Sequence, residues 1–330
     1  MTTAERPRAA EALGTRARNL LADRPELALA VVIVGLVIAN VAASDGGFWS
    51  LGQLRNTLLT AAPLAIIAGG QMLCMLTGGI DLSVTATATA AAYFMAHHAL
   101  HGETRGILIG LGVGVLIGLA NGIGIAIFRV HPLIMTLGSL LVVIALLTIG
   151  VTSFLEGDIL VPNSIREMAG GTLFWYVPTV LLAWICVAFV LMAGLRLTGL
   201  GRSIYAVGDN PRAARLAGMR VWQVLIAVYV LSALLAAIAG LIYAGQTNGA
   251  DLELAKPYLL PSVAAAVIGG VSIFGGIGGY GGTILGALIL TLLDTLMTLL
   301  NTGQAVQTMI YGAIVLALAV LYAKATGAED

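Results

Sequence analysis

The sequence predicts an all-α protein that crosses a membrane about ten times. Hydrophobic residues make up 59% of its 330 residues and charged residues only 10%, whereas a soluble domain carries about 25% charged residues. The hydrophobic residues gather in runs close to the ~20 residues that a helix needs to cross a bilayer. Many of the 42 glycines lie within these runs, as expected where membrane helices pack closely or break.

The apolar runs define the predicted membrane spans. The first run, 27–43, follows a polar segment that holds five arginines. A cleaved signal peptide is the alternative for this run, because Val41-Ala42-Ala43 resembles a cleavage site, but the length of the run and the spans after it favour a retained helix. The other predicted spans are 57–76, 83–99, 106–128, 133–153, 173–195, 223–246, 260–277, 281–300 and 305–323.

The distribution of basic residues predicts which side of the membrane each loop faces. An even number of spans places both termini on the same side. Under that topology, 12 of the 16 lysines and arginines lie on the side of the termini. Because cytoplasmic loops carry an excess of Lys and Arg, we expect the N-terminal segment 1–26, the polar segment 201–221 and the tail 324–330 in the cytoplasm. Residues 27–323 then form the transmembrane domain.

The polar segment 201–221 contains a short helix with both ends marked. Asn210 suits the N-cap and Pro211 suits the first helical turn. Gly218 supplies the left-handed residue that commonly ends a helix. A helix this short is marginal alone in water, so we expect it to pack against other parts of the protein and to present a contact surface to a soluble partner. An ordinary polar loop with a helical turn is the alternative.

The chain lacks the residue patterns of an enzyme. A P-loop needs Gly-Lys-Ser/Thr, and neither lysine, Lys256 or Lys324, follows a glycine. The sequence holds no Gly-x-Ser-x-Gly and no His-Glu-x-x-His. His97 and His101, four residues apart with His98 between them, would share a helical face, but solvated or interfacial histidines are favoured over a metal site. We therefore expect no ATPase site, metal or cofactor in this chain.

An acidic residue inside an apolar span is the sharpest functional signal. Asp294 lies within TLLDTLMTLL, about 20 Å from the inner end of its span at 1.5 Å per residue, which is the outer half of a membrane about 30 Å thick. A charge there is costly unless it faces a cavity or a polar partner, so a hydrogen bond to a neighbouring helix is the alternative to a pathway role. Asp81 lies at a span end, where capping of the next helix together with Ser83 is favoured.

A similar four-residue segment occurs twice in the sequence, and this pattern indicates an inverted repeat. Gly79-Ile80-Asp81-Leu82 precedes the third predicted span, and Gly249-Ala250-Asp251-Leu252 precedes the eighth. In the predicted topology these two segments lie on opposite faces of the membrane, as an inverted repeat would place them. Chance similarity is the alternative for a match this short.

Three sequence blocks together form a specific pattern: TGGIDLS at 77–83, GRSIYAVGDNPRAARLAGM at 201–219 and VIGGVSIFGGIGGYGGTILGALI at 267–289. They resemble the permease subunit of bacterial ABC sugar importers of the ribose/arabinose/xylose/galactose type. Weaker support comes from Asn121-Gly122 and from PLIMTLG at 132–138. The resemblance covers roughly residues 50–323, and it departs from the family pattern at Thr85 and around Asp294.

The resemblance implies a division of labour between several chains. The family's permeases are homodimers in the bacterial inner membrane, and they work with a periplasmic or lipid-anchored sugar-binding protein and with ATPase chains that bind ATP and Mg²⁺. It implies no nucleic acid partner. The family's coupling segment to the ATPase corresponds to Asn210, Pro211, Arg212, Ala213, Ala214, Arg215 and Gly218.

The expected function is a transmembrane path for a monosaccharide. ATP-driven closure of the partner ATPases would move the 210–218 helices and switch the path between outward and inward access. The candidates for residues along this path are Asp294, Asn121 and Asp81. A secondary transporter or channel for a small polar solute is the alternative, although it would usually need more buried ionisable residues. The sequence does not name the sugar.

Overall fold

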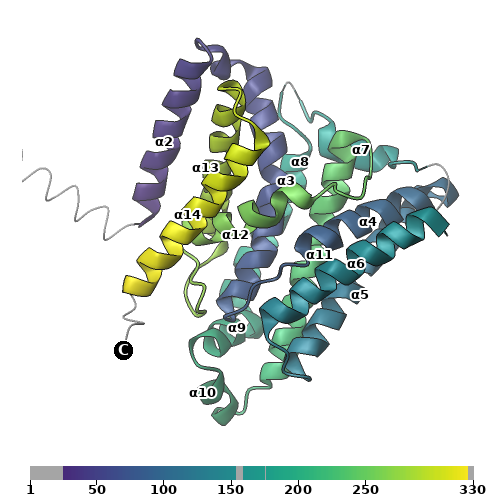
Figure 1. The fold of residues 1–330 in the computed structure, drawn as a ribbon, viewed down its shortest axis with the longest axis vertical. Coiled ribbons are helices and arrows are strands. Elements are labelled where there is room, and N and C mark those ends of the chain that lie inside the picture. The colour runs from purple at the N-terminus through teal and green to yellow at the C-terminus, as the bar shows by residue number, and fades with distance from the viewer. Residues whose placement is uncertain (1–24, 154–158, 175, 326–330) are drawn as a thin grey trace, which may run out of the picture.

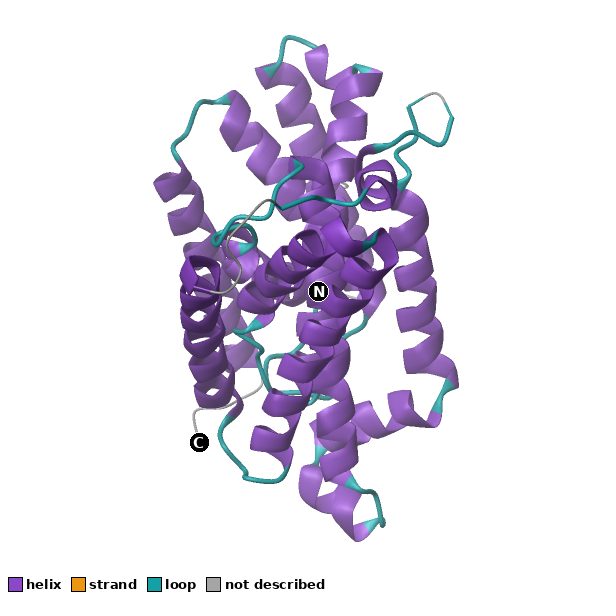
Figure 2. Ribbon diagram, turned by 90° about the vertical axis from the view of Figure 1, so that its right-hand side faces the viewer, coloured by secondary structure: helices purple, strands orange, loops and turns teal. Residues whose placement is uncertain are grey.

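The computed structural model describes residues 25–153, 159–174 and 176–325, and this part of the chain is built from helices (Figures 1 and 2). The one β contact among these residues is an isolated bridge between Thr172 and Pro178. The predicted all-α class is confirmed. The helices are α2 (Pro25–Ala43), α3 (Leu51–Leu76), α4 (Val84–His98), α5 (Glu103–Ala126), α6 (Pro132–Ser153), α7 (Asn163–Gly170), α8 (Val180–Leu197), α9 (Gly199–Asp209), α10 (Pro211–Leu216), α11 (Val221–Thr247), α12 (Leu259–Ile268), α13 (Tyr280–Leu299) and α14 (Gln304–Ala325), with 3₁₀ turns η1 (Gly47–Trp49), η2 (Ala99–His101) and η3 (Lys256–Tyr258).

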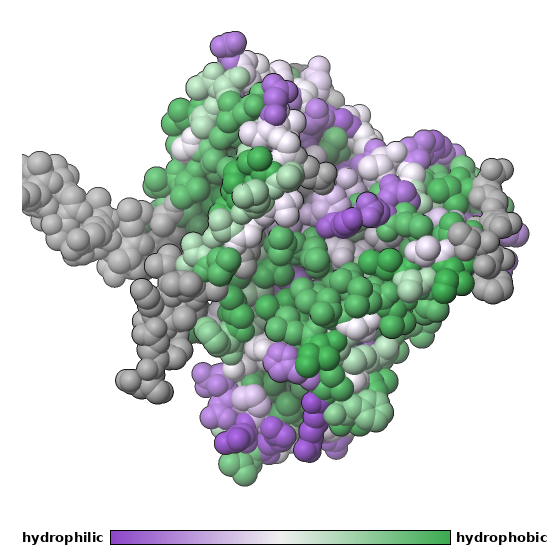
Figure 3. Space-filling view, viewed as in Figure 1, coloured by the Kyte–Doolittle hydropathy of each residue, from purple (hydrophilic) through white to green (hydrophobic). Residues whose placement is uncertain are grey.

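Six of the helices in the described part are long and apolar enough to cross a membrane, namely α3, α5, α6, α8, α11 and α13. Shorter apolar helices lie at 29–43, 256–268 and 305–314. Each of the ten predicted spans overlaps one helix. Figure 3 shows hydrophobic side chains over the middle of one face and hydrophilic ones gathered at its lower end, where Figure 1 places α9 and α10.

Helix α11 lies at the centre of the packing, and α5 approaches it along a row of glycines. A Cβ at Gly114 would lie 3.0 Å from the carbonyl oxygen of Ala233, and one at Gly118 would lie 2.8 Å from that of Tyr229. Small residues at every fourth position let membrane helices approach backbone to backbone. Of the buried glycines of α5, Gly106 and Gly110 lie against α4, and Gly114, Gly118 and Gly122 lie against α11.

The predicted span 260–277 is wrong in its second half. Helix α12 ends at Ile268, and 269–279 forms a loop before α13. Backbone geometry explains the early end, because Gly270 has φ +83° and Gly278 has φ +132°, which an α-helix does not contain. The span that starts at 173 is also too long, since α8 begins at Val180.

The short helix α7 packs against α11, and charged side chains bond to both of its ends. The Glu103 carboxylate accepts the backbone N–H of Asn163 at 2.9 Å and the hydroxyl of Ser164 at 2.7 Å. At the other end, the Arg55 guanidinium donates to the carbonyl of Gly170. An anion at a helix N-terminus and a cation at its C-terminus both complement the helix dipole. Helix α7 is therefore held in one orientation on α11.

Candidate functional site

The predicted N-terminus of the contact helix is confirmed. Asn210 has an extended backbone, and its Oδ1 accepts the N–H groups of Arg212 and Ala213, both at 3.0 Å. Pro211 occupies the first position of α10, where its missing N–H costs nothing. The Arg212 side chain is exposed. Local sequence alone therefore specifies how this helix begins.

The predicted C-terminus of α10 is also confirmed. Gly218 has φ +83°, and the N–H of Met219 donates to the carbonyl of Ala214 at 3.1 Å. This is the pattern of a helix closed by a left-handed residue. Ala214 is buried against the protein, whereas Arg215 is exposed and the Leu216 side chain is 92% exposed. Helix α10 thus presents cationic and apolar side chains away from the rest of the chain.

The polar segment holds a second helix, which the sequence reasoning did not identify. Helix α9 runs from Gly199 to Asp209, directly before α10, and Thr198 caps it by accepting the N–H of Gly201 at 3.1 Å. Ile204 and Val207 form its buried face. Figure 1 shows α9 between α10 and the lower end of α3. Helix α9 therefore connects the contact helix to the membrane domain.

The end of α9 lies where three distant segments meet. A Cβ at Gly208 would overlap the carbonyl oxygen of Leu76 at the end of α3, and would lie 2.6 Å from the backbone nitrogen of Gly276. The Gly276 N–H donates to the same Leu76 carbonyl at 3.0 Å. One turn earlier on α9, the Tyr205 hydroxyl donates to the carbonyl of Gly278 at 2.8 Å. We call the contact of Gly208, Leu76 and Gly276 the glycine junction.

The glycine junction joins two of the blocks singled out in the sequence, 201–219 and 267–289, to Leu76, the residue directly before the third block, 77–83. Gly208 and Tyr205 were not predicted as site residues. The signal that could have identified Gly208 is its place inside a helix, one residue before the end of α9. A glycine inside a helix is unfavourable, so its presence there indicates that another backbone needs the space. The junction requires that space.

Asp81 lies in a buried turn rather than on an open surface. Its side chain has 0% exposure. The carboxylate accepts the N–H of Ser83 at 3.0 Å, the Ser83 hydroxyl at 2.6 Å and the Ser232 hydroxyl of α11 at 3.0 Å. The Gln71 amide pairs with the backbone of Asp81 through bonds of 2.8 and 3.1 Å. Asp81 therefore joins α3 and α11 through the turn before α4.

Asn121 belongs to the same buried network. Its Nδ2 donates to the Ser83 hydroxyl at 2.8 Å, and its Oδ1 accepts the Ser139 hydroxyl at 2.5 Å. The network thereby extends to α5 and α6. The pathway role of Asp81 and Asn121 stays a prediction, and their bonds favour a role in positioning the helices, since buried polar groups with complete hydrogen bonds make a core rigid.

Asp294 lies on a cavity in the half of the molecule opposite α10. Its carboxylate is half-buried on α13, and the Tyr311 hydroxyl of α14 donates to Oδ1 at 3.1 Å. Both features weighed for this residue, a cavity and a hydrogen bond to a neighbouring helix, are thus present. The cavity has a volume of about 660 Å³, and it is bordered by α3, α11, the start of α12 with the segment before it, α13 and α14. Its polar and aromatic lining includes Asp294, Thr291, Gln307, Tyr243, Tyr258 and Tyr311.

The histidines do not share an α-helical face as predicted. Helix α4 ends at His98, and the chain continues as the 3₁₀ turn η2 to His101, so the spacing of four residues no longer corresponds to one helical turn. His98 Nδ1 contacts the carbonyl of Phe94 at 3.0 Å. Nowhere in the described part of the chain do three His, Cys, Asp or Glu side chains group as metal ligands.

The family comparison matches most of the chain. Residues 53–319 match the family model described as branched-chain amino acid transport system / permease component. The matched range includes the buried network, α9 and α10, the glycine junction and Asp294. No solved structure matches this chain.

Individual relatives match over nearly their whole length. The fructose import permease protein FrcC of Rhizobium meliloti is 31% identical, over 91% of this chain and 85% of the relative. The ribose import permease protein RbsC of Escherichia coli K12 is 36% identical, over 87% of this chain and 90% of the relative. The autoinducer 2 import system permease protein LsrC of Yersinia pseudotuberculosis is 30% identical, over 88% and 83%.

Proposed function

Because this chain belongs to the family of branched-chain amino acid transport system permease components, we propose that it is the permease subunit of an ABC importer in the bacterial inner membrane. It forms the path for a monosaccharide that a binding protein delivers. The family description names an amino acid, but two of the relatives are named for import of fructose and ribose. At 31% and 36% identity along most of both chains, these relatives favour a sugar.

The glycine junction is the observation that supports coupling to a partner ATPase. The partner contacts the exposed side of α10, where Arg212, Arg215 and Leu216 project. Displacement of α10 moves α9, and α9 contacts α3 and the 269–279 loop through Gly208. A close-packed backbone contact transmits such a displacement because it leaves no space to absorb it. The partner binds ATP and Mg²⁺, since this chain has no P-loop.

The order of the helices supports ten crossings with both termini in the cytoplasm. Helices α2, α4 and α14, and α12 together with the 269–279 loop, add four segments to the six candidate spans in the order of the chain. The described start of α2 and the described end of α14 then lie on the side of α9 and α10. A second copy of the permease completes the transporter, and its lipid-facing surface contacts the bilayer.

Transport by the assembled complex tests this function. The permease is reconstituted in liposomes with its ATPase and binding protein, and uptake of labelled ribose and fructose is measured. We expect uptake that requires ATP, the ATPase and the binding protein. Uptake by the permease alone, driven by an ion gradient, would instead support a secondary transporter.

The variant Gly218→Val tests the coupling segment itself. A β-branched side chain is strained at φ +83°, although a Cβ at this position meets nothing within 4 Å. We expect weaker co-purification with the ATPase and less transport, whereas Gly303→Val in the turn before α14 leaves both unchanged. Normal co-purification and transport by Gly218→Val would show that α10 is not the coupling element.

A further inference from the structure

The outer cavity has a size and a lining that suit a small polyhydroxylated molecule. Its volume of about 660 Å³ lies within the range of roughly 300–1,000 Å³ found for ligand pockets. It is lined by aromatic, hydroxyl, amide and carboxylate side chains. A site that binds a small molecule in one orientation combines apolar walls with a few fixed polar groups, and this cavity has both.

The position of the cavity places it near the outer opening of the proposed path. Asp294 lies 14 residues after the start of α13 at Tyr280, which is about 21 Å along the helix. The start of α13 is near the glycine junction and therefore near the proposed cytoplasmic side. The cavity is also lined by Glu253 and Lys256 from the connection between α11 and α12. A solute released outside would meet this cavity early.

The charges around the cavity favour a neutral solute. Lys256 and Glu253 pair with each other at 2.6 Å, with exposed side chains. Asp294 is the other charged residue among the described lining residues. An anionic solute or the carboxylate of an amino acid would therefore face a carboxylate, while the nearby cation is already paired. Sugar hydroxyls can donate to a carboxylate, and hydrogen bonds to charged groups are stronger than neutral ones.

The aromatic side chains supply the apolar part of the site. The rings of Tyr243 and Tyr258 pack edge to face with centroids 5.1 Å apart, and both line the cavity with Tyr311. Tyrosine combines an apolar ring with a polar tip, as does a sugar ring with its C–H faces and hydroxyls. The Tyr311 hydroxyl, which donates to Asp294 Oδ1 at 3.1 Å, holds the carboxylate in one orientation.

We propose that this cavity is a low-affinity transit site for a neutral monosaccharide, in which Asp294 accepts sugar hydroxyls and Tyr258 provides an apolar wall. This inference rests on the proposed function and adds to it the location of a site on the path and the residues that contact the sugar. The site holds the sugar between its release from the binding protein and the change to inward access.

Protection of an introduced cysteine tests the site directly. Of the native cysteines, Cys74 is buried and Cys186 is exposed, so the background carries Cys186→Ala. Gln307→Cys places a thiol in the cavity lining, and Val306→Cys places one on the adjacent residue, which is 45% exposed and outside the lining. The permease in nanodiscs is labelled with a polar maleimide while ribose, fructose or leucine is added.

Ribose or fructose should slow labelling of Gln307→Cys in a saturable way and leave Val306→Cys unchanged, and leucine should protect neither. Asp294→Asn keeps the shape of the side chain but loses its charge, so the sugar concentration for half protection should rise about fivefold or more. Tyr258→Leu, which leaves the carboxylate in place, should weaken protection as well. Elution of each variant as a single species on size exclusion verifies its folding.

Three results would overturn the proposal: no protection of Gln307→Cys by either sugar, equal protection of Val306→Cys, or protection by leucine as strong as by sugar. ATP-driven uptake by the wild-type complex is measured in parallel. Normal uptake without protection contradicts the transit site and leaves the importer function intact. Protection without ATP-driven uptake contradicts the importer function instead.

Discussion

The loop after α3 and the loop after α11 have the same local structure in very different surroundings. Gly79 and Gly249 each donate their N–H to the carbonyl five residues earlier, at 3.0 and 3.2 Å. Asp81 and Asp251 each accept the N–H two residues later, at 3.0 and 2.8 Å. A left-handed residue, Gly78 or Asn248, precedes each glycine. We refer to them as the inner loop, 77–83, and the outer loop, 248–258.

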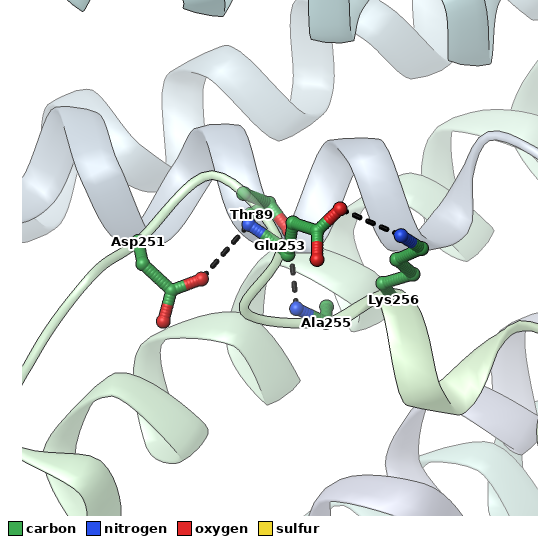
Figure 4. Close-up of polar contacts among 5 residues, drawn as sticks. All are labelled: Thr89, Asp251, Glu253, Ala255 and Lys256. Carbon is green, nitrogen blue, oxygen red and sulfur yellow. Dashed lines mark hydrogen bonds and ion pairs between the residues drawn. The ribbon is translucent and has the colours of Figure 1, made fainter. Parts of the chain in front are cut away.

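The two loops differ in what surrounds the aspartate. Asp81 is fully buried and bonded to Ser83 and Ser232. Asp251 is exposed, and its loop is held instead by the bond from the Ala255 N–H to Thr89 Oγ1 at 3.2 Å and by the exposed Glu253–Lys256 pair (Figure 4). The inner loop is locked between helices, whereas the outer loop borders the cavity.

This comparison supports the proposal of an inverted repeat. Each loop follows one of the longest helices and leads to a shorter one, α4 after the inner loop and α12 after the outer loop. This is expected when two related halves are inserted in opposite orientations. The same turn chemistry serves to fix the helices on the inner side, next to the glycine junction. On the outer side it leaves charged groups exposed at the proposed point of sugar arrival.

The largest difference should appear when the two aspartates are removed. Asp81→Ala leaves the buried hydroxyl of Ser232 and the N–H of Ser83 without their acceptor, so we expect a loss of stability of about 3 kcal/mol. Asp251→Ala, its matched control in the outer loop, should cost less than about 0.5 kcal/mol because the site is exposed. Thermal unfolding in detergent measures both. Equal losses would show that burial does not distinguish the loops.

A methyl group in the glycine junction should break the connection between the inner loop and α9. The Cβ of Gly208→Ala would overlap the Leu76 carbonyl, and such overpacking costs typically about 1–3 kcal/mol. We expect transport to fall at least tenfold while the ATPase still co-purifies. Gly281→Ala is the control, because a Cβ there meets nothing within 4 Å. Normal transport by Gly208→Ala would exclude the junction from coupling.

The hydrogen bond that holds the outer loop should have a smaller effect. Thr89→Val preserves the shape but removes the acceptor for the buried Ala255 N–H, which costs about 1–2 kcal/mol. We expect faster hydrogen exchange in the outer loop and unchanged exchange in the inner loop. In the control Thr87→Val, the lost hydroxyl donates to the carbonyl of Ser83 at the end of the inner loop, so exchange in the outer loop should not change.

The smallest effect should come from the exposed ion pair of the outer loop. Lys256→Gln removes the 2.6 Å contact with Glu253, whose side chain is 72% exposed. Pairs this exposed contribute at most about 1 kcal/mol, so thermal stability should change by less than that. Sugar protection in the cavity should persist, because the proposed ligand is neutral. A large loss of protection would mean that the pair contacts the sugar.

Local sequence specified the helices and the ends of α10. Asn210, Pro211 and Gly218 act through atoms within a few residues of each other, so their roles can be recognised in a single chain. The apolar runs likewise predicted a helix at each of the ten positions, since hydrophobicity is a property of each segment. The prediction of a helix through 269–277 was wrong. Several glycines of this segment have positive φ, and hydrophobicity does not reveal that backbone conformation.

The partners of the site residues depended on the packing of helices that are far apart in the chain. Ser232 bonds to Asp81 across 151 residues. Tyr311 reaches Asp294 from α14, a helix that packs against α12. Gly208 has no side chain to signal a contact, yet the junction exists because that side chain is missing. Charge inside a span indicated that Asp294 needs a polar environment, while the tertiary structure assigned it a cavity and assigned Asp81 a buried network.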